Sequence, residues 1–253
     1  MMKSELKENI YILSSSKLGE ELVFPTDEKL SGLLNRLANC SLDFQNELCL
    51  VLGKKSKILS SEDSKFDLPP LMKKFVIVGD DESFVFFPGT FDPWHSGHTE
   101  CVTQLIKKGK KVIIAPDFNP WKDYKLRSPS EVFLEIEKAL KENDSVVYYP
   151  GFLPLKKINP TITWIEKLEK ENRSLLMGDD SFMSLLKWKD AKRLIGLLKS
   201  LYVLPRLELK THRDEQVQKI LSLNPELEIH ILSHHDYEEV SSTEIRNKTR
   251  NKK

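Results

Sequence analysis

The hydrophobic positions of the chain follow one pattern up to about residue 82 and a different one after it. From residue 84 onward, short apolar runs alternate with longer amphipathic stretches. The strand-like runs are 84–87, 111–115, 146–149, 174–177, 201–204 and 228–232. The helix-like stretches are 99–108, 129–141, 161–171, 181–187, 191–198 and 217–223, with another from Ser242 onward. This alternation predicts a Rossmann-like, doubly wound α/β fold with a parallel sheet and helices on both of its faces.

The first 82 residues predict a small α+β segment instead. Residues 9–13 and 47–53 have the apolar content of short strands. Thr26 is a candidate N-cap for a helix between them, because its hydroxyl can accept an orphan backbone N–H. The apolar residues of that helix share one face: Leu30, Leu33, Leu34 and Leu37. We therefore divide the chain into residues 1–82, in which we find no chemical motif, and a main domain of residues 83–253.

Composition and charge narrow the function classes. The chain has 253 residues, with 39 Lys or Arg and 38 Asp or Glu, and a formal net charge of +1. This balance gives no general argument for binding nucleic acid or an anionic membrane, so phosphate recognition needs a local site. The N-terminus lacks the apolar region of a secretory signal, and no stretch approaches the roughly 20 apolar residues that span a bilayer. The three widely spaced cysteines match no metal or disulfide pattern, so we expect a cytoplasmic protein with reduced thiols.

The stretch PGTFDPWHSGH at residues 88–98 directly follows the first strand of the main domain. Gly89 allows the backbone to approach a ligand closely, and Gly97 leaves room for one. His95 and His98 stand at the start of a helix, where free backbone N–H groups and the helix dipole favour an anion. Two histidines at this spacing are more often surface residues, or sometimes a metal pair. The agreement of strand, glycine turn and helix start favours a polyphosphate site here.

A second stretch, VSSTEIR at residues 240–246, begins the last helix. The hydroxyls of Ser242 and Thr243, together with the first amides of the helix, can hold phosphate oxygens. Arg246 lies about one turn further and can reach the same anion with its guanidinium fork. For an isolated Ser-Ser-Thr, a plain N-cap with an exposed arginine is the commoner arrangement. The pairing with the first stretch favours a phosphate site.

These two stretches resemble the GTFDPxHxGH and ISSTxIR motifs of the nucleotidyltransferase superfamily. The resemblance implies that ATP is bound by Gly89, Thr90, Phe91, Asp92, His95, Gly97, His98, Ser242, Thr243 and Arg246. Pro88 departs from the nicotinate mononucleotide enzymes, which usually have glycine there, and is more like phosphopantetheine adenylyltransferase. The latter normally lacks the first histidine of the motif, which this chain supplies as His95.

Two segments between the motifs resemble the nicotinate mononucleotide adenylyltransferases more narrowly. Gly178, Asp179 and Asp180, followed by Trp188, resemble the GxD…W segment of that family. The resemblance implies that Gly178 and Asp180 line the nucleotide site and bind ATP, with Asp179 at the variable position. It also implies that Trp188 stacks on the pyridine ring of the acceptor, as two flat aromatic systems can. A tryptophan that packs its helix is the alternative.

The stretch NPWK resembles the PPHK loop of the family, although Trp121 replaces the histidine, so only Lys122 carries over as a phosphate contact. The stretch NPTIT resembles the SYTxxT segment that contacts the acceptor. Pro160 replaces its tyrosine, and Thr161 remains in place. The acceptor side therefore departs from the family more than the ATP side does.

The resemblance implies an enzyme that transfers AMP from ATP to nicotinate mononucleotide, forming deamido-NAD and pyrophosphate in NAD biosynthesis. His95, His98, Lys122 and Arg246 would offset charge on the triphosphate, and Mg²⁺ would be bound mainly through ATP, without an all-protein metal site. Other acceptors, nicotinamide mononucleotide or phosphopantetheine, stay open, as does a nucleotide-binding regulatory protein without turnover. We expect neither a membrane nor a nucleic acid as a partner, and the sequence leaves a homo-oligomer open.

Overall fold

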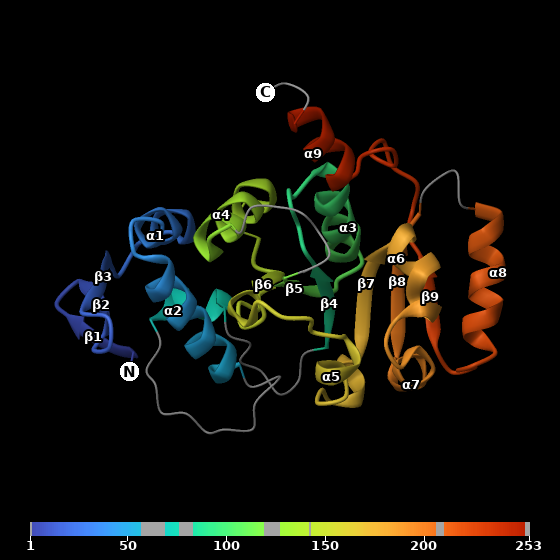
Figure 1. Ribbon diagram of the computed structural model, residues 1–253, viewed down its shortest axis with the longest axis horizontal. Coiled ribbons are helices and arrows are strands. Elements are labelled where there is room, and N and C mark those ends of the chain that lie inside the picture. Colours follow the sequence, from blue (N-terminus) through green and yellow to red (C-terminus); the bar gives the residue numbers. More distant parts are fainter. Residues whose placement is uncertain are drawn as a thin grey trace. The chain divides into compact units, whose positions relative to one another are not determined.

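The structure is a computed structural model that describes residues 2–56, 69–75, 83–118, 127–141, 143–205 and 210–250. Within these ranges the chain forms a three-stranded sheet of order β1-β2-β3 and a six-stranded sheet of order β6-β5-β4-β7-β8-β9 (Figure 1). The chain divides into two compact units: Met1–Asp80 with Ala115–Ile158, and Asp81–Ile114 with Asn159–Lys253. Over the described residues, no helix is both long and apolar enough to cross a membrane.

The six-stranded sheet has the order of a doubly wound fold. Strand β4 is the first strand of this sheet in the sequence. Strands β5 and β6 follow on one side of β4, and β7, β8 and β9 then lie on its other side. The pairings with a described register, β4–β7, β7–β8 and β8–β9, are all parallel. The strands are β4 (Phe84–Gly89), β5 (Lys111–Pro116), β6 (Val146–Tyr148), β7 (Ser174–Gly178), β8 (Ser200–Leu204) and β9 (Glu228–Ile231). The expected Rossmann-like α/β fold is confirmed.

Helices connect these strands and cover their apolar side chains. They are α3 (Ser96–Lys107), α4 (Pro129–Leu140), α5 (Ile162–Ile165), α6 (Asp179–Ser184), α7 (Ala191–Leu197), α8 (Lys210–Leu221) and α9 (Ser242–Arg250). Short 3₁₀ turns lie at η2 (Leu153–Leu155), η3 (Lys170–Asn172) and η4 (Leu185–Lys187). Strand β8 is buried along its whole length, and Trp164 of α5 packs on Phe86 of β4 with ring centroids 5.2 Å apart. Continuous burial explains why these strands appear in the sequence as unbroken apolar runs.

The N-terminal residues form the small α+β arrangement that the sequence predicts. Its elements are β1 (Met2–Lys7), β2 (Ile10–Ser15), β3 (Glu20–Pro25), α1 (Leu30–Leu37), α2 (Leu42–Lys55) and the 3₁₀ turn η1 (Pro70–Phe75). The strands are antiparallel, and the register pairs Leu13 with Leu22 and Tyr11 with Phe24. Each pair places two apolar side chains on one face, which is the face that carries the buried residues of the sheet.

The N-terminal elements pack on α4 and β6, which belong to the same compact unit. The buried Gln45 side chain of α2 accepts a hydrogen bond from the backbone N–H of Ser130, 3.2 Å away, in the first turn of α4. Phe75 of η1 packs edge-on against Phe133 of α4, with ring centroids 5.1 Å apart. The first residues therefore share a hydrophobic core with part of the main domain. The division at residue 82 remains a prediction from the sequence.

The expected strand at residues 47–53 is wrong, because these residues lie inside helix α2. A short apolar run cannot distinguish a strand from a buried helix by periodicity alone. The start signal was Ser41, whose side chain accepts from the backbone N–H of Phe44 at 3.1 Å. The proposed cap at Thr26 is also wrong: α1 begins at Leu30, after Lys29.

Four further elements differ from the sequence predictions. The helix expected at 161–171 is only α5 (Ile162–Ile165), followed by a 3₁₀ turn. Arg173 donates to the backbone oxygens of Leu168 and Glu166, which satisfies carbonyls that a longer helix would have bonded itself. Strands β1 and β3 were not predicted. Strand β1 is mostly polar and exposed, so it lacks the apolar run that would indicate a strand. Helix α8 starts at Lys210, well before residue 217.

The helical placement of Cys49 leads to a chemical prediction. Burial raises the pKa of the Cys49 thiol to about 12, whereas Cys40 is only partly buried, and its pKa is raised by burial and by Glu20. At pH 8 the Cys49 thiol, with a pKa of about 12, is ionised in about one molecule in ten thousand. We expect iodoacetamide to modify Cys40 in the native protein and Cys49 only after unfolding in guanidinium. Peptide mass spectrometry would measure both; equal native rates would contradict the burial of Cys49 in α2.

Candidate functional site

The carboxyl ends of β4 and β7 lie side by side at one edge of the sheet. The register pairs Phe86 with Leu175, and three residues further along each strand stand Gly89 and Gly178. The two strands flank the point where the sheet order reverses. Ligands of open α/β sheets bind at this point, beyond the carboxyl ends of the strands. Gly89 of the first motif and Gly178 of the GxD…W segment therefore lie where the fold binds ligands.

The loop after β4 is held by a cluster of aromatic rings. Phe91 has a positive φ of 47° and is 3% exposed, with its ring centroid 5.0 Å from those of Phe87 and Trp94. A Cβ atom at Gly89 would lie 2.8 Å from the Phe91 ring, so only glycine fits beneath it. Because the Phe91 ring is buried, a ligand at this loop can meet only its backbone. Thr90 is half-buried between Gly89 and Phe91.

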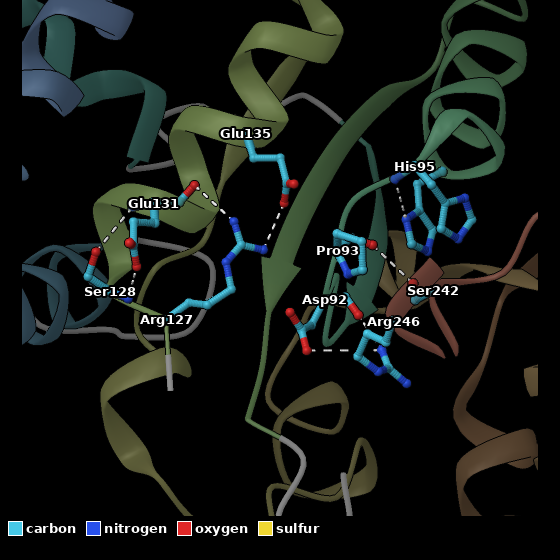
Figure 2. A network of polar contacts seen from close by, with 10 residues as sticks. Asp92, Pro93, His95, Arg127, Ser128, Glu131, Glu135, Ser242 and Arg246 are labelled. Carbon is cyan, nitrogen blue, oxygen red and sulfur yellow. Dashed lines mark hydrogen bonds and ion pairs between the residues drawn. The ribbon is translucent and has the colours of Figure 1, made fainter. Parts of the chain in front are cut away.

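His95 and His98 stand together at the start of α3. Their rings are stacked, with centroids 3.7 Å apart and an angle of 24° between the planes. The backbone N–H of His95 donates to Nδ1 of His98 at 3.3 Å (Figure 2). This bond assigns the proton of a neutral His98 ring to Nε2, which can then donate to an anion. The structure thus brings the two motif histidines into one half-buried pair.

Gly97 lies close against the ring of His95. A Cβ atom at Gly97 would lie 3.1 Å from Cε1 and Nδ1 of His95, and 3.6 Å from the backbone oxygen of Tyr237. The sequence suggested that Gly97 leaves room for a ligand. In the structure that room is occupied on one side by the neighbouring imidazole and on the other by the loop that leads into α9.

Helix α9 docks onto the loop after β4 and joins the two motifs. Ser242 Oγ donates to the backbone oxygen of Pro93 at 3.0 Å, and the Arg246 guanidinium donates to the backbone oxygen of Asp92 (Figure 2). Arg246 Nη1 also lies 4.0 Å from the Asp92 carboxylate, and Nη2 donates to Thr243 Oγ1 at 3.1 Å. The two motifs, far apart in the sequence, therefore face each other in the structure. The result is one cluster of a guanidinium, imidazoles and hydroxyls at the carboxyl end of the strands.

The loop before α9 contains polar residues that sequence reasoning missed. Gln104 of α3 holds the loop through both amide atoms, at 2.8 Å from the N–H and 3.0 Å from the oxygen of Ser233. Glu238 accepts from His234 Nδ1 at 2.6 Å and from the N–H of His235 at 3.2 Å. Burial opposes ionisation of Glu238, but these hydrogen bonds hold its pKa below the ordinary value. The spacing of His234 and Glu238 by four residues was the available signal.

The two consecutive aspartates after β7 have different surroundings. Asp179 is fully buried, and its carboxylate lies 2.8 Å from Nη1 of the buried Arg213 of α8. Asp180, the next residue of the same helix, is exposed. The assignment of Asp180 rather than Asp179 to the nucleotide site accords with this difference, and it remains a prediction.

The expected acceptor residues have mainly local contacts. Trp188 is half-buried, and its indole N–H donates to Ser184 Oγ at 3.3 Å. Thr161 is half-buried at the start of α5. Their roles toward an acceptor remain predictions. Lys122 lies outside the described residues.

Comparisons with known proteins agree with this fold. A model of the family described as cytidylyltransferase-like matches residues 86–248. A probable nicotinate-nucleotide adenylyltransferase of Buchnera aphidicola is 30% identical over 140 residues, which cover 51% of this chain and 63% of the relative. One of Fusobacterium nucleatum is 27% identical over 175 residues, covering 66% of this chain and 86% of the relative.

A solved structure shares the fold. It is the Plasmodium falciparum nicotinic acid mononucleotide adenylyltransferase complexed with APC, with a TM-score of 0.50 and 13% identity. The match covers 66% of this chain and 83% of the other. At this identity the likeness supports the fold alone.

The ionised Glu238 leads to a prediction about pH. Because its pKa is lower in the folded protein than in the unfolded chain, Glu238 stabilises the fold above the unfolded pKa. That contribution is lost as the pH falls through the lowered, folded pKa. We expect Glu238→Gln to unfold at lower urea than the wild type at pH 7, with the difference shrinking in acid below about pH 4. The exposed neighbour gives the control Glu239→Gln, and a difference that stays constant with pH would contradict the role of Glu238.

Proposed function

We propose that this chain, which belongs to the cytidylyltransferase-like family, transfers the AMP part of ATP to nicotinate mononucleotide and so forms deamido-NAD and pyrophosphate in NAD biosynthesis. The observation that carries the proposal is the docking of α9 on the loop after β4, which gathers the residues of both phosphate motifs at the switch point of the sheet. The names of the bacterial relatives support the acceptor.

The phosphate end of ATP would be bound by the cluster around α3 and α9. The imidazoles of His95 and His98 and the hydroxyls of Ser242 and Thr243 would supply N–H and O–H donors, while Arg246 would supply a charged fork. Arg246 has only a backbone carbonyl, a hydroxyl and a carboxylate at 4.0 Å as described partners, so a triphosphate oxygen could replace them. We assign Lys122 to the same phosphates on the basis of the NPWK stretch alone.

The reaction needs positioning and charge stabilisation rather than a covalent intermediate. An oxygen of the acceptor phosphate attacks the α-phosphorus of ATP in line, the bond from that phosphorus to the bridging oxygen breaks, and pyrophosphate leaves with the electron pair. A phosphate monoester is already ionised near neutral pH, so no strong general base is required. His95, His98, Lys122 and Arg246 would offset the charge that builds on the leaving pyrophosphate.

Mg²⁺ belongs to this proposal as a partner of ATP. Among the described residues, no group of three or more His, Cys, Asp or Glu side chains is arranged to hold a metal ion. In this proposal the ion is carried mainly by the phosphate oxygens, which is a common arrangement for Mg²⁺. The ion would lower the charge of the triphosphate and hold it in the shape that the cluster binds.

The acceptor would lie on the side of β7 and α6. Gly178 and Asp180 would line the nucleotide site, Trp188 would stack on the pyridine ring, and Thr161 would bind the acceptor. We place the reaction in the cytoplasm, in keeping with the reduced thiols and with relatives named for a step of small-molecule metabolism.

Phosphopantetheine is the second candidate acceptor, and Pro88 favours it. A direct assay separates the two. Protein is incubated with ATP, Mg²⁺ and one acceptor, which is nicotinate mononucleotide, nicotinamide mononucleotide or phosphopantetheine, and both pyrophosphate and the adenylylated product are measured. We expect the highest kcat/KM with nicotinate mononucleotide. Product from another acceptor alone would reassign the substrate, and ATP binding without any product would indicate a regulatory protein.

The His98 side chain provides a test of the phosphate cluster. We expect His98→Ala to lower kcat by about a hundredfold or more, which is the usual cost of losing a donor to developing charge. The circular dichroism spectrum and the melting temperature should stay near those of the wild type. The exposed His212 of α8 gives the matched control, since His212→Ala should retain full turnover. Wild-type turnover in a folded His98→Ala protein would remove His98 from the mechanism.

A further inference from the structure

Helix α8 presents polar side chains to the interior of the protein, where a helix normally presents apolar ones. Arg213 and Gln216 are 3% and 5% exposed, and Ile220 is fully buried. The spacing of these residues by three and four positions places them on one face of the helix. Two buried polar groups on a buried helix face need partners, because desolvation of an unbonded group is unfavourable.

Both partners lie on helix α6. Arg213 Nη1 lies 2.8 Å from Oδ2 of Asp179, the first residue of α6, and the two side chains are 4% and 0% exposed. Gln216 Nε2 donates to the backbone oxygens of Phe182 at 3.0 Å and Met183 at 3.4 Å. These carbonyls belong to the last turn of α6, where a helix leaves its oxygens without partners of its own. Helix α8 therefore holds α6 at both of its ends.

The attachment at Asp179 fixes the direction of the next residue. Consecutive side chains of an α-helix point about 100° apart. With Asp179 held inward by Arg213, Asp180 is turned outward, where the structure finds it exposed. Two adjacent aspartates could compete for one inward position, since either carboxylate suits an arginine. The short helix has only six residues, so its own hydrogen bonds hold its rotation weakly.

We propose that Arg213 is a positioning residue for the nucleotide site: its ion pair with Asp179 selects which of the two aspartates faces the ligand, and Gln216 holds the other end of the same helix. The proposal rests on the proposed function, because it takes Asp180 as the residue that meets the nucleotide. The same helix leads, through Ser184, to Trp188, whose indole N–H donates to Ser184 Oγ at 3.3 Å. The position of α6 therefore affects both proposed contacts, Asp180 with the nucleotide and Trp188 with the acceptor.

A double-mutant cycle tests the proposal. Arg213→Met and Asp180→Ala are made singly and together, and kcat/KM is measured with ATP and the acceptor that the assay above identifies. We expect Arg213→Met to lower kcat/KM about tenfold in the wild-type background and to have no further effect when Asp180 is already alanine. A purely structural role of Arg213 would give equal losses in both backgrounds, and that outcome would overturn the proposal.

Two more variants separate positioning from general stability. Asp179→Asn keeps the shape of the partner of Arg213 and removes its charge. It should therefore lower kcat/KM as Arg213→Met is expected to, and it takes the place of Arg213→Met in the test if that variant fails to fold. Lys219→Met changes an exposed residue of α8 and should leave kcat/KM unchanged. Arg213→Lys retains the charge without the planar fork and should recover only part of the activity. A full loss in Lys219→Met would assign the effects to the helix as a whole.

A readout without turnover keeps the test independent of the acceptor. Hydrogen exchange followed by mass spectrometry should show faster exchange in peptides covering residues 178–186 of Arg213→Met, with peptides of α3 unchanged. Titration calorimetry with Mg·ATP alone should show weaker binding. If the wild type binds ATP but makes no product, the proposed reaction fails, while these two measurements still decide the role of Arg213. Unchanged exchange and ATP affinity would overturn it.

Discussion

The site depends on a small set of hydrogen bonds between α9 and the loop after β4. Ser242 and Arg246 bond to the backbone oxygens of Pro93 and Asp92, residues that lie 149 and 154 positions earlier in the chain. Because the acceptors are backbone carbonyls, they are fixed by the path of the loop and not by its side chains. The parallel sheet sets the start of that path, since the first motif begins at the end of β4.

The loop can hold this shape because aromatic side chains pack against one another within it and because Gly89 leaves space for the Phe91 ring. The rings of Phe87, Phe91, Trp94 and His98 contact one another, with all centroid distances between 5.0 and 6.1 Å. Trp94 also donates from its indole N–H to Thr99 Oγ1 at 2.8 Å, which ties the loop to the first turn of α3. Apolar packing thus orders a segment whose exposed atoms are polar. His98 is here both a ligand candidate and a half-buried member of the aromatic cluster.

The sequence predicted what depends on local pattern and failed where distant contacts decide. Buried parallel strands appear as apolar runs, so the main sheet and the placement of both motifs at its edge could be predicted. Residues 47–53 were mistaken for a strand because a buried helix also appears as an apolar run. The start of α8 was missed because its buried face carries Arg213 and Gln216, which no search for apolar periodicity finds. The difference between Asp179 and Asp180 likewise depends on a partner 34 residues away.

The contacts of Arg246 suggest how the site changes when ATP binds. Its hydrogen bond to the Asp92 carbonyl joins a cation to a neutral acceptor, whereas a triphosphate oxygen is an anionic acceptor. A phosphate is anionic and can accept two parallel N–H bonds from one guanidinium, which adds energy beyond a single bond to a carbonyl, so a phosphate would compete well for the fork. Ser242 would keep α9 attached through Pro93 while the guanidinium turns. Helix α9 can therefore stay in place while Arg246 exchanges its partner. A site that binds ATP and then releases pyrophosphate requires such an exchange.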